Sequence, residues 1–315
     1  MRAVILGGTG AIGGAVAARL AAADWWVDVT GRDPGAMPRE LEVAGVRFHQ
    51  IERSETSAIG RLVAEGADLL VDLLAYRSAD VRALLPVMAS VACAVLISSR
   101  AVYVDTNGRH LNGEEPPWFP GPVSEDTPTL SPVGDDGAYP FTREGYAPSK
   151  VAVERVALDS GLPVTVIRPS KVHGRWARNP RTRVFVERIL RGDPTITLAE
   201  GTSIDHLTAA ANTAALIETV AGKPGQRVLN SADPDTPTAE QIVRAIGERL
   251  DWEGGLELVG SQVDPTVGDH PWRSVSPMVL DTGASERLGY TPQGRALELL
   301  TQEVDWIAEQ PTSPR

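Results

Sequence analysis

The sequence predicts an α/β protein, with a doubly wound parallel sheet of the Rossmann type and a smaller C-terminal substrate lobe. Short apolar runs alternate with segments of helical spacing, and a glycine-rich turn directly follows the first run. The apolar runs are unbroken, as burial on both faces of a parallel sheet requires. The predicted strands cover 3–6, 27–30, 69–74, 91–98 and 164–168, and the predicted helices cover 13–23, 57–65, 79–90 and 150–160.

After about residue 172 the pattern loosens, and we predict helices over 183–191, 208–221, 238–250 and 295–309 and a strand over 227–230. We expect residues 1–172, with about 205–232, to form an NADP-binding Rossmann domain. Residues 173–204 and 233–315 would form the substrate-binding lobe. The segment from Asp105 to Phe141 is rich in Gly, Pro, Asp and Glu, and we expect this long loop to be a lid or a wall of the substrate site.

Composition excludes several classes of protein. The net charge of -11 would repel nucleic acid, and no run of five basic residues offsets it. The single cysteine, Cys93, lies in an apolar stretch, which excludes a disulfide framework and favours a reducing, cytoplasmic location. No stretch approaches the roughly 18 apolar residues of a membrane span, so we expect a soluble protein without a membrane partner.

Glycines at 7, 10 and 13 form the turn between the first strand and the first helix. Gly7 suits a tight turn, Gly10 lets the backbone approach a pyrophosphate, and Gly13 lets helix and strand pack closely. The helix N-terminus adds N–H groups and a positive dipole end, so a dinucleotide is expected here. The expected cofactor contacts are Gly7, Thr9, Gly10, Ala11, Ile12, Gly13, Arg32, Leu74, Ala75, Lys150, Pro169 and Val172.

The end of the second strand indicates which cofactor is used. An acidic side chain there binds ribose hydroxyls, whereas an arginine accommodates a 2'-phosphate. The strand ends in Gly31, and Arg32 follows it without a carboxylate at the tip. The sequence therefore favours NADP(H), with NAD(H) as the alternative; Arg32 could also be a solvated loop charge paired with Asp33.

Tyr146 and Lys150 are four residues apart and hence on one face of a helix. Pro148 fits if it lies in the first turn, which would put Tyr146 at the exposed mouth of that helix. The ammonium would favour the phenolate, so that Tyr146 could exchange a proton with a carbinol. Ser99, just past the strand over 91–98, could bind the substrate oxygen, or simply satisfy loop backbone.

These residues resemble the extended and atypical short-chain dehydrogenase/reductases, a group that includes nucleotide-sugar epimerases and dehydratases. The resemblance covers nearly the whole chain and implies that Ser99, rather than Ser98, holds the catalytic position. The similar segments are Gly7–Gly13 (phosphate loop), Ser99–Tyr103 (Ser-x-x-Val-Tyr), Tyr146–Lys150 (Tyr-x-x-x-Lys), Arg168–Gly174 (Arg-Pro-x-x-Val-Tyr-Gly, lining nicotinamide and substrate), Ile204–Leu207, Val228–Asn230 and Leu280–Tyr290.

Several residues depart from the family pattern. The sugar 4,6-dehydratases follow their threonine with an Asp-Glu pair, whereas Arg100 and Ala101 stand here, so dehydration is disfavoured. Lys171 replaces an asparagine, His173 a tyrosine and His206 an aspartate, which weakens the inference of a nucleotide-sugar substrate.

Basic residues cluster after these motifs and could bind a substrate phosphate or carboxylate, or form a solvated loop with scattered ion pairs. The substrate candidates are Arg100, Lys171 and Arg175. No metal is expected, because His173 and His206 lack nearby carboxylate spacing. The basic cluster consists of Lys171, Arg175, Arg178, Arg181 and Arg183.

Together these patterns predict an NADP(H)-dependent oxidoreductase that transfers a hydride between nicotinamide and a small alcohol or ketone. Ser99, Tyr146 and Lys150 are its predicted catalytic residues. One alternative is a nucleotide-sugar epimerase that reduces its cofactor transiently, and another is a cofactor-sensing protein without catalysis. The sequence leaves the substrate, and whether the chain forms a homodimer, open.

Overall fold

The computed structural model describes residues 1–134, 137, 139–260, 264 and 266–310. Asp135, Asp136 and Ala138 of the predicted loop, and 261–263, 265 and 311–315 of the predicted lobe, lie outside the described residues.

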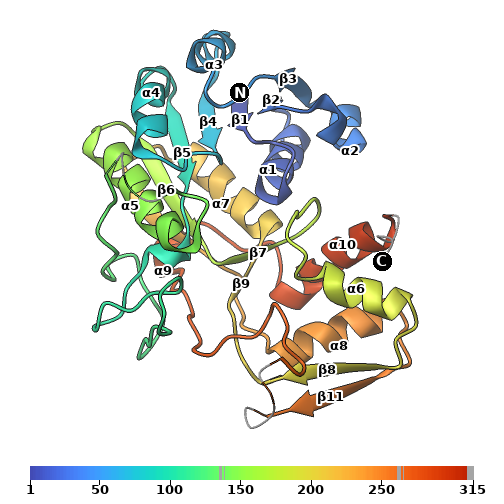
Figure 1. Ribbon diagram of the computed structural model, residues 1–315. Coiled ribbons are helices and arrows are strands. Elements are labelled where there is room, and N and C mark those ends of the chain that lie inside the picture. Colours follow the sequence, from blue (N-terminus) through green and yellow to red (C-terminus); the bar gives the residue numbers. More distant parts are fainter. Residues whose placement is uncertain (135–136, 138, 261–263, 265, 311–315) are drawn as a thin grey trace.

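A seven-stranded parallel sheet forms the centre of the molecule, in the order β10-β6-β5-β4-β1-β2-β3 (Figure 1). This confirms the predicted fold class, a doubly wound α/β sheet in which strand order reverses beside β1. The strands are β1 Arg2–Leu6, β2 Trp26–Gly31, β3 Arg47–Gln50, β4 Leu69–Asp72, β5 Cys93–Ile97, β6 Val164–Pro169 and β10 Arg227–Ser231.

Helices cover both faces of this sheet and bury two separate apolar cores. On one face Leu20 of α1 and Ile217 of α7 pack against Ile5. On the other, Leu62 of α3, Leu84 of α4 and Val153 of α5 pack with residues of β1 and β4. The helices around the sheet are α1 Ala11–Ala22, α2 Arg39–Val43, α3 Thr56–Val63, α4 Ser78–Met88, α5 Arg143–Asp159, α7 Ala210–Ala221 and α9 Gly283–Arg287.

The edge strand β3 and the short helix α2 were not predicted from the sequence. The four residues of β3 include Arg47, His49 and Gln50, and none of the four is fully buried. An edge strand pairs on one side only and needs no apolar run, so its sequence lacks the pattern that identified the central strands.

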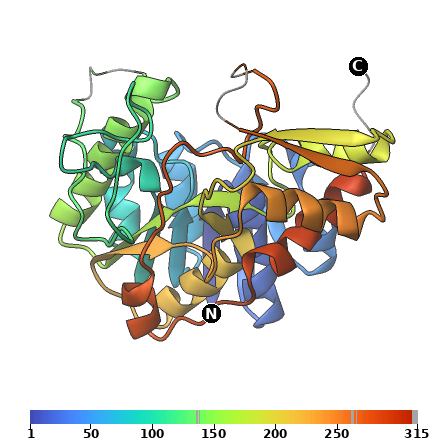
Figure 2. The same cartoon turned by 90° about the horizontal axis from the view of Figure 1, so that it is seen from below.

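A second group of elements lies beside the sheet, where Figure 2 shows the helices α8 and α10 next to the strands β8 and β11. Its core gathers Phe185, Ile242, Trp272 and Leu300. Among the described residues, no helix is long and apolar enough to cross a membrane. The elements are α6 Arg183–Leu190, β8 Thr195–Ala199, α8 Ala239–Arg249, β11 Gly255–Val259 and α10 Ala296–Ala308, and a further pair of strands, β7 Lys171–His173 and β9 Leu207–Ala209, lies next to the sheet.

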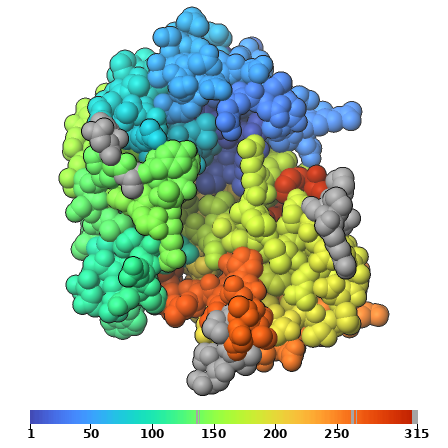
Figure 3. All heavy atoms as spheres, in the orientation of Figure 1, coloured from blue at the N-terminus to red at the C-terminus, as the bar shows by residue number. Residues whose placement is uncertain are grey.

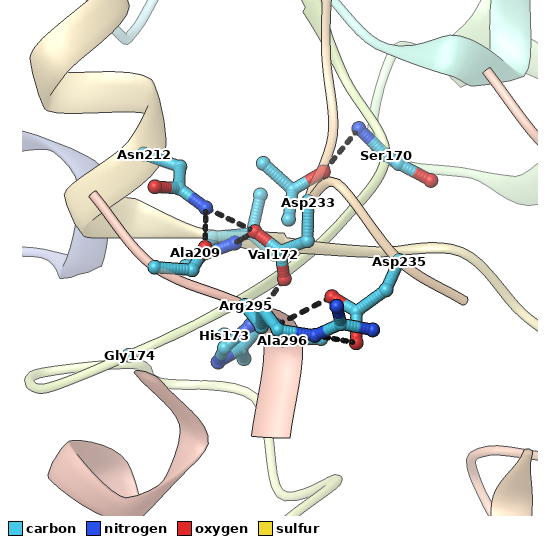
Figure 4. A network of polar contacts seen from close by, with 12 residues as sticks. Ser170, Val172, His173, Gly174, Ala209, Asn212, Asp233, Asp235, Arg295 and Ala296 are labelled. Atoms are coloured by element: carbon cyan, nitrogen blue, oxygen red, sulfur yellow. Dashed lines mark hydrogen bonds and ion pairs between the residues drawn. The ribbon is translucent and has the colours of Figure 1, made fainter. Parts of the chain in front are cut away.

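A buried network around Asp233 links these parts, as Figure 4 shows. One carboxylate oxygen lies 2.8 Å from Nε2 of His173 in β7. The other accepts hydrogen bonds from the backbone N–H of Ala209 and the amide of Asn212, at 2.7 and 2.8 Å. Asp233 follows β10, so a single side chain joins the sheet edge to β7, β9 and α7.

Candidate active site

Two adjoining cavities lie at the carboxyl ends of the strands, and Figure 3 shows this face hollowed between blue, green and yellow segments. We call them the Arg32 cavity and the Tyr146 cavity. Gly7, Gly10 and Tyr76 line both. The Arg32 cavity, of about 1130 Å³, is also lined by Thr9, Arg32, Arg53, Leu74, Arg77, Tyr139, Phe141 and Arg178; the Tyr146 cavity, of about 460 Å³, by Ala11, Ile12, Gly13, Ser99, Arg100, Leu111, Tyr146, Lys150, Pro169, Ser170, Lys171, Val172 and Arg181.

The glycine turn between β1 and α1 is built for close approach. Gly7 has φ of 89°, in the left-handed region that favours glycine. A Cβ at Gly13 would lie 2.4 Å from the carbonyl oxygen of Gly7, whereas one at Gly10 would meet no atom within 4 Å. Helix α1 begins beside this open space with no side-chain cap on its N-terminal N–H groups. The turn therefore fits a pyrophosphate, which these N–H groups would bind.

Arg32 is exposed at the end of β2 and lines its cavity without an ion pair to Asp33. The Asp33 carboxylate instead accepts a hydrogen bond from Gly35 N at 2.9 Å. The carboxylate within β2, Asp28, is fully buried and pairs with basic side chains. Arg178 lines the same cavity and donates a hydrogen bond to the Thr9 hydroxyl at 3.0 Å.

Helix α5 carries Tyr146 and Lys150 and begins earlier than expected, at Arg143. The hydroxyl of Thr142 accepts a hydrogen bond from Gly145 N at 3.1 Å and caps the helix. Pro148 therefore lies beyond the first turn, where it removes one backbone hydrogen bond. The predictions of Pro148 in the first turn and of an exposed Tyr146 are wrong, since Tyr146 is partly buried.

Lys150 is almost completely buried and extends to carbonyl groups at the end of β5 and in the loop after β4. Its Nζ donates hydrogen bonds to the carbonyl oxygens of Ala75 at 2.8 Å and Ile97 at 3.0 Å. Burial lowers the pKa of Lys150 to about 8. Ala75, a predicted cofactor contact, is not among the residues that line either cavity.

Burial dominates the electrostatics of Tyr146. Desolvation raises its pKa above the ordinary value, and a hydrogen bond with Ser99 offsets only part of this. The protein's own groups therefore favour the protonated form of Tyr146. This is the opposite of the shift toward phenolate that the sequence analysis expected from Lys150. The Ser99 hydroxyl also accepts a hydrogen bond from Ala101 N at 3.1 Å, as expected of a hydroxyl that satisfies loop backbone, and its contact with a substrate stays a prediction.

Tyr76 is a site residue that the sequence analysis missed. Its ring centroid lies 4.4 Å from Lys150 Nζ, 4.7 Å from the ring of Phe141 and 6.5 Å from that of Tyr146. It stands between the two cavities because it follows the carboxyl end of β4. That position, where ligands bind in such sheets, was the signal that could have found it.

The basic cluster divides among separate surroundings. Lys171 and Arg181 line the Tyr146 cavity with Arg100, and Asp205 forms ion pairs with Arg100 and Lys171. The structure places Arg175 away from this cavity: it forms an ion pair with Glu40 at 2.6 Å. Arg183 lies 3.6 Å from Glu187 on α6, and Arg178 faces the Arg32 cavity.

The 105–141 segment borders both cavities and forms no helix or strand in its described part. Leu111 lines the Tyr146 cavity, and residues 139–141 line the Arg32 cavity. Asp105 accepts backbone hydrogen bonds from Asn107, Arg109 and Trp118 and so holds the start of the loop.

Both histidines considered as a metal pair have protein partners. His173 contacts the Asp233 carboxylate. Nδ1 of His206 accepts a hydrogen bond from Leu280 N, so its Nε2–H donates to the Asp233 carbonyl oxygen at 2.8 Å. This pattern requires a neutral imidazole at His206, in keeping with the pKa that burial lowers.

Comparisons with known proteins bear on the family pattern and the fold. Residues 3–102 match the family model described as the NAD dependent epimerase/dehydratase family. A comparison with curated proteins found no match. Similar solved structures include UDP-glucose 4-epimerase with UDP-glucose from Thermotoga maritima (18% identity, 97% of this chain and 98% of that chain, TM-score 0.70). Others are UDP-glucuronic acid 4-epimerase with UDP-glucuronic acid and NAD from Bacillus cereus (17%, 98% and 99%, 0.70) and dTDP-glucose 4,6-dehydratase with NAD from Streptomyces venezuelae (20%, 97% and 96%, 0.71).

The fold and the glycine turn define a Rossmann protein of dinucleotide-binding type. More narrowly, the resemblance to the extended short-chain dehydrogenase/reductases is confirmed. The chain has their fold over nearly its whole length, and residues 3–102 carry the sequence pattern of the NAD-dependent epimerase/dehydratase family.

Proposed function

We propose that this protein is an NADP(H)-dependent oxidoreductase that reduces a small ketone or oxidises the corresponding alcohol. One observation carries the proposal: Ser99, Tyr146 and Lys150 line the same cavity as the glycine turn. A group held against that turn would therefore lie beside an acid, a hydrogen-bond donor and a cation. The bound nicotinamide would supply or accept the hydride.

The side chains provide the proton chemistry of a reduction. Tyr146 stays protonated at neutral pH because burial raises its pKa, so its hydroxyl can donate a proton to the carbonyl oxygen. The Ser99 hydroxyl would hold that oxygen in place. The Lys150 cation, one helical turn along α5, would stabilise the phenolate left after proton transfer.

The preference for NADP(H) is supported by charges in the Arg32 cavity. Arg32 has no carboxylate partner among the described residues, and Arg178 lies against Thr9 in the same cavity. A guanidinium there can bind a 2'-phosphate through two hydrogen bonds. NAD(H) carries hydroxyls at this position, and one of the two oxygens of the Asp33 carboxylate that could bind them already accepts a hydrogen bond from Gly35 N.

An experiment on Arg32 tests the cofactor. Arg32→Ala should weaken NADPH binding about tenfold or more while changing NADH binding less than threefold, because only the 2'-phosphate loses a partner. Calorimetric titration of both cofactors measures this. Arg39→Ala, a change at an exposed arginine of α2 outside both cavities, is the control. Equal losses for the two cofactors would remove the preference for NADP(H).

A nucleotide-sugar epimerase is the second candidate, and it is favoured by the similarity to UDP-glucose and UDP-glucuronic acid 4-epimerases. Net reduction consumes NADPH in proportion to product, whereas epimerisation restores the cofactor in each turnover. A 4,6-dehydratase is disfavoured, since Arg100 and Ala101 follow Ser99 where that reaction uses an Asp-Glu pair.

The reaction is tested by following NADPH oxidation with a panel of small ketones and aldehydes. Tyr146→Phe should lower turnover about 100-fold or more, because the proton donor is lost, and leave NADPH affinity nearly unchanged. Tyr290→Phe, which removes a buried hydroxyl that has no hydrogen-bond partner among the described residues and lines neither cavity, is the matched control. Full activity of Tyr146→Phe would reject the assigned acid.

A further inference from the structure

The Tyr146 cavity has a charge opposite to that of the whole protein. Four cationic side chains line it, and no carboxylate of the described residues does. The chain as a whole has a net charge of -11, so this concentration of positive charge is local. The four cations are Arg100, Lys150, Lys171 and Arg181.

The protein neutralises only part of this charge. Asp205 lies behind the cavity wall and forms ion pairs with both Arg100 and Lys171. Lys150 is held by backbone carbonyls. Arg181 forms no ion pair with a carboxylate among the described residues, although Glu303 and Asp205 act on its charge from a longer distance, and its buried Nε has no acceptor. Two carboxylates therefore act on three nearby cations, since the buried Glu303 lies close enough to Arg181 to interact with its charge. Burying the remaining positive charge is unfavourable without a further anion.

The cations are also held in place before any ligand arrives. Lys171 Nζ donates a hydrogen bond to the Pro271 carbonyl oxygen at 2.6 Å, and Arg181 donates one to the Val172 carbonyl oxygen at 2.7 Å. Both cations lie over the buried ring of Trp272, at 5.3 and 5.7 Å from its centroid. Desolvation lowers the pKa of each, which is the response expected of cations that lack sufficient counter-charge.

We propose that the substrate is a small carbonyl compound bearing a carboxylate or a phosphate, which Lys171 and Arg181 bind while its carbonyl faces Tyr146 and Ser99. This rests on the proposed function, since it takes the cavity as the substrate site of that reaction. The Tyr146 cavity has a volume of about 460 Å³, and it includes the space beside the glycine turn where part of the cofactor would lie. The volume that remains suits a small substrate. Lys171 supplies a compact charge and Arg181 a planar fork of donors.

Two matched pairs of compounds test the proposal. Levulinate is compared with its neutral methyl ester, and dihydroxyacetone phosphate with dihydroxyacetone. Binding is measured by calorimetry on the whole protein with and without NADPH, and turnover by NADPH oxidation. We expect at least one anionic member to bind about tenfold or more tightly than its neutral partner, because charge-assisted hydrogen bonds form only with the anion. If the protein discriminates within the levulinate pair, the site binds a carboxylate; if it discriminates within the dihydroxyacetone pair, the site binds a phosphate.

Arg181→Gln should reduce that discrimination to about threefold or less, since one of its two partners is lost, while the affinity for NADPH stays within about twofold. Arg183→Gln is the matched control, because Arg183 lies two residues away on α6, pairs with Glu187 and does not line the cavity. It should retain the full preference. Thermal unfolding of both variants identifies any loss of folding, and Arg181→Lys, which keeps the charge, should restore part of the preference.

Each result decides something. Equal affinity for anionic and neutral partners in the unchanged protein, or full preference in a folded Arg181→Gln, overturns the proposal. A large loss of NADPH affinity in Arg181→Gln also overturns the proposal, because it would show that Arg181 binds the cofactor and not the substrate. Uridine diphosphate binding more tightly than every small anion overturns it as well. If the protein discriminates between anionic and neutral compounds but turns over no carbonyl, the anion site is supported and the proposed reaction is rejected. If it turns over carbonyls without this discrimination, the reaction is supported and the anion site is rejected.

Discussion

Tyr146 and Lys150 show how burial sets the protonation of the site. Both belong to one helix face, yet burial shifts them in opposite directions, raising the pKa of the phenol and lowering that of the amine to about 8. At neutral pH the pair is a phenol beside an ammonium. That is the state required for proton donation to a carbonyl oxygen.

Reduction should therefore slow as Lys150 loses its proton. The cationic form exists below its pKa of about 8, so kcat/KM should fall as pH rises through that value, well before Tyr146 titrates. The pH profile of NADPH oxidation measures this. Lys150→Met should be slow and flat over the same range, and Lys223→Met, at an exposed lysine, should keep the fall. A flat profile in the unchanged protein up to pH of about 10 contradicts the assignment.

Helix α5 is the element on which the site depends, because it carries both the acid and the cation. Its start is determined by the Thr142 cap, whose hydroxyl accepts the Gly145 N–H. The periodicity of the sequence predicted a helix over 150–160, and the Tyr146–Lys150 spacing predicted a helix with Pro148 in its first turn. The helix instead begins at the Thr142 cap, runs through the proline and packs against α4, and Tyr146 is partly buried on it.

Loss of the cap should destabilise this helix. Thr142→Ala should lower the free energy of unfolding by about 1 kcal/mol, because Gly145 N loses its acceptor. Thr142→Ser keeps a hydroxyl and should lose less than about half of that. Denaturant unfolding of the three proteins provides the comparison. Equal stability of Thr142→Ala and the unchanged protein would show that the cap does not stabilise α5.

At the scale of the whole molecule, Asp233 joins the sheet to the elements beside it. It is buried with His173, Ala209 and Asn212, and their hydrogen bonds hold its pKa below the usual range. A carboxyl whose pKa is lowered on folding stabilises the folded state above its unfolded pKa. That stabilisation is lost as pH falls through the folded-state pKa.

Asp233→Asn should thus lower the free energy of unfolding by about 2 kcal/mol at pH of about 7, since the buried carboxylate loses its charge-assisted bonds. The difference from the unchanged protein should shrink as pH falls below about 4. Denaturant unfolding at several pH values measures both effects. Asp24→Asn, at an exposed residue, is the control. A difference that persists unchanged into acid would contradict the role assigned to the carboxylate.

Local pattern in the chain was enough to predict the sheet, the glycine turn and the placement of Tyr146 and Lys150 on one helix face, because periodicity and turn chemistry act between neighbouring residues. The same pattern missed the polar edge strand β3 and the place of Tyr76. Which residues contact a cofactor, and the division into two domains, stay predictions.

Only the tertiary structure decided the charge states and the side chains that meet in the cavity. Lys150 meets the carbonyls of Ala75 and Ile97, and Lys171 meets Asp205, across long separations in sequence. The same packing turns Arg181 toward the cavity and Arg175 toward Glu40, although the sequence presents them as one cluster. Burial and through-space charge depend on segments distant in the chain, and for that physical reason no local pattern contains them.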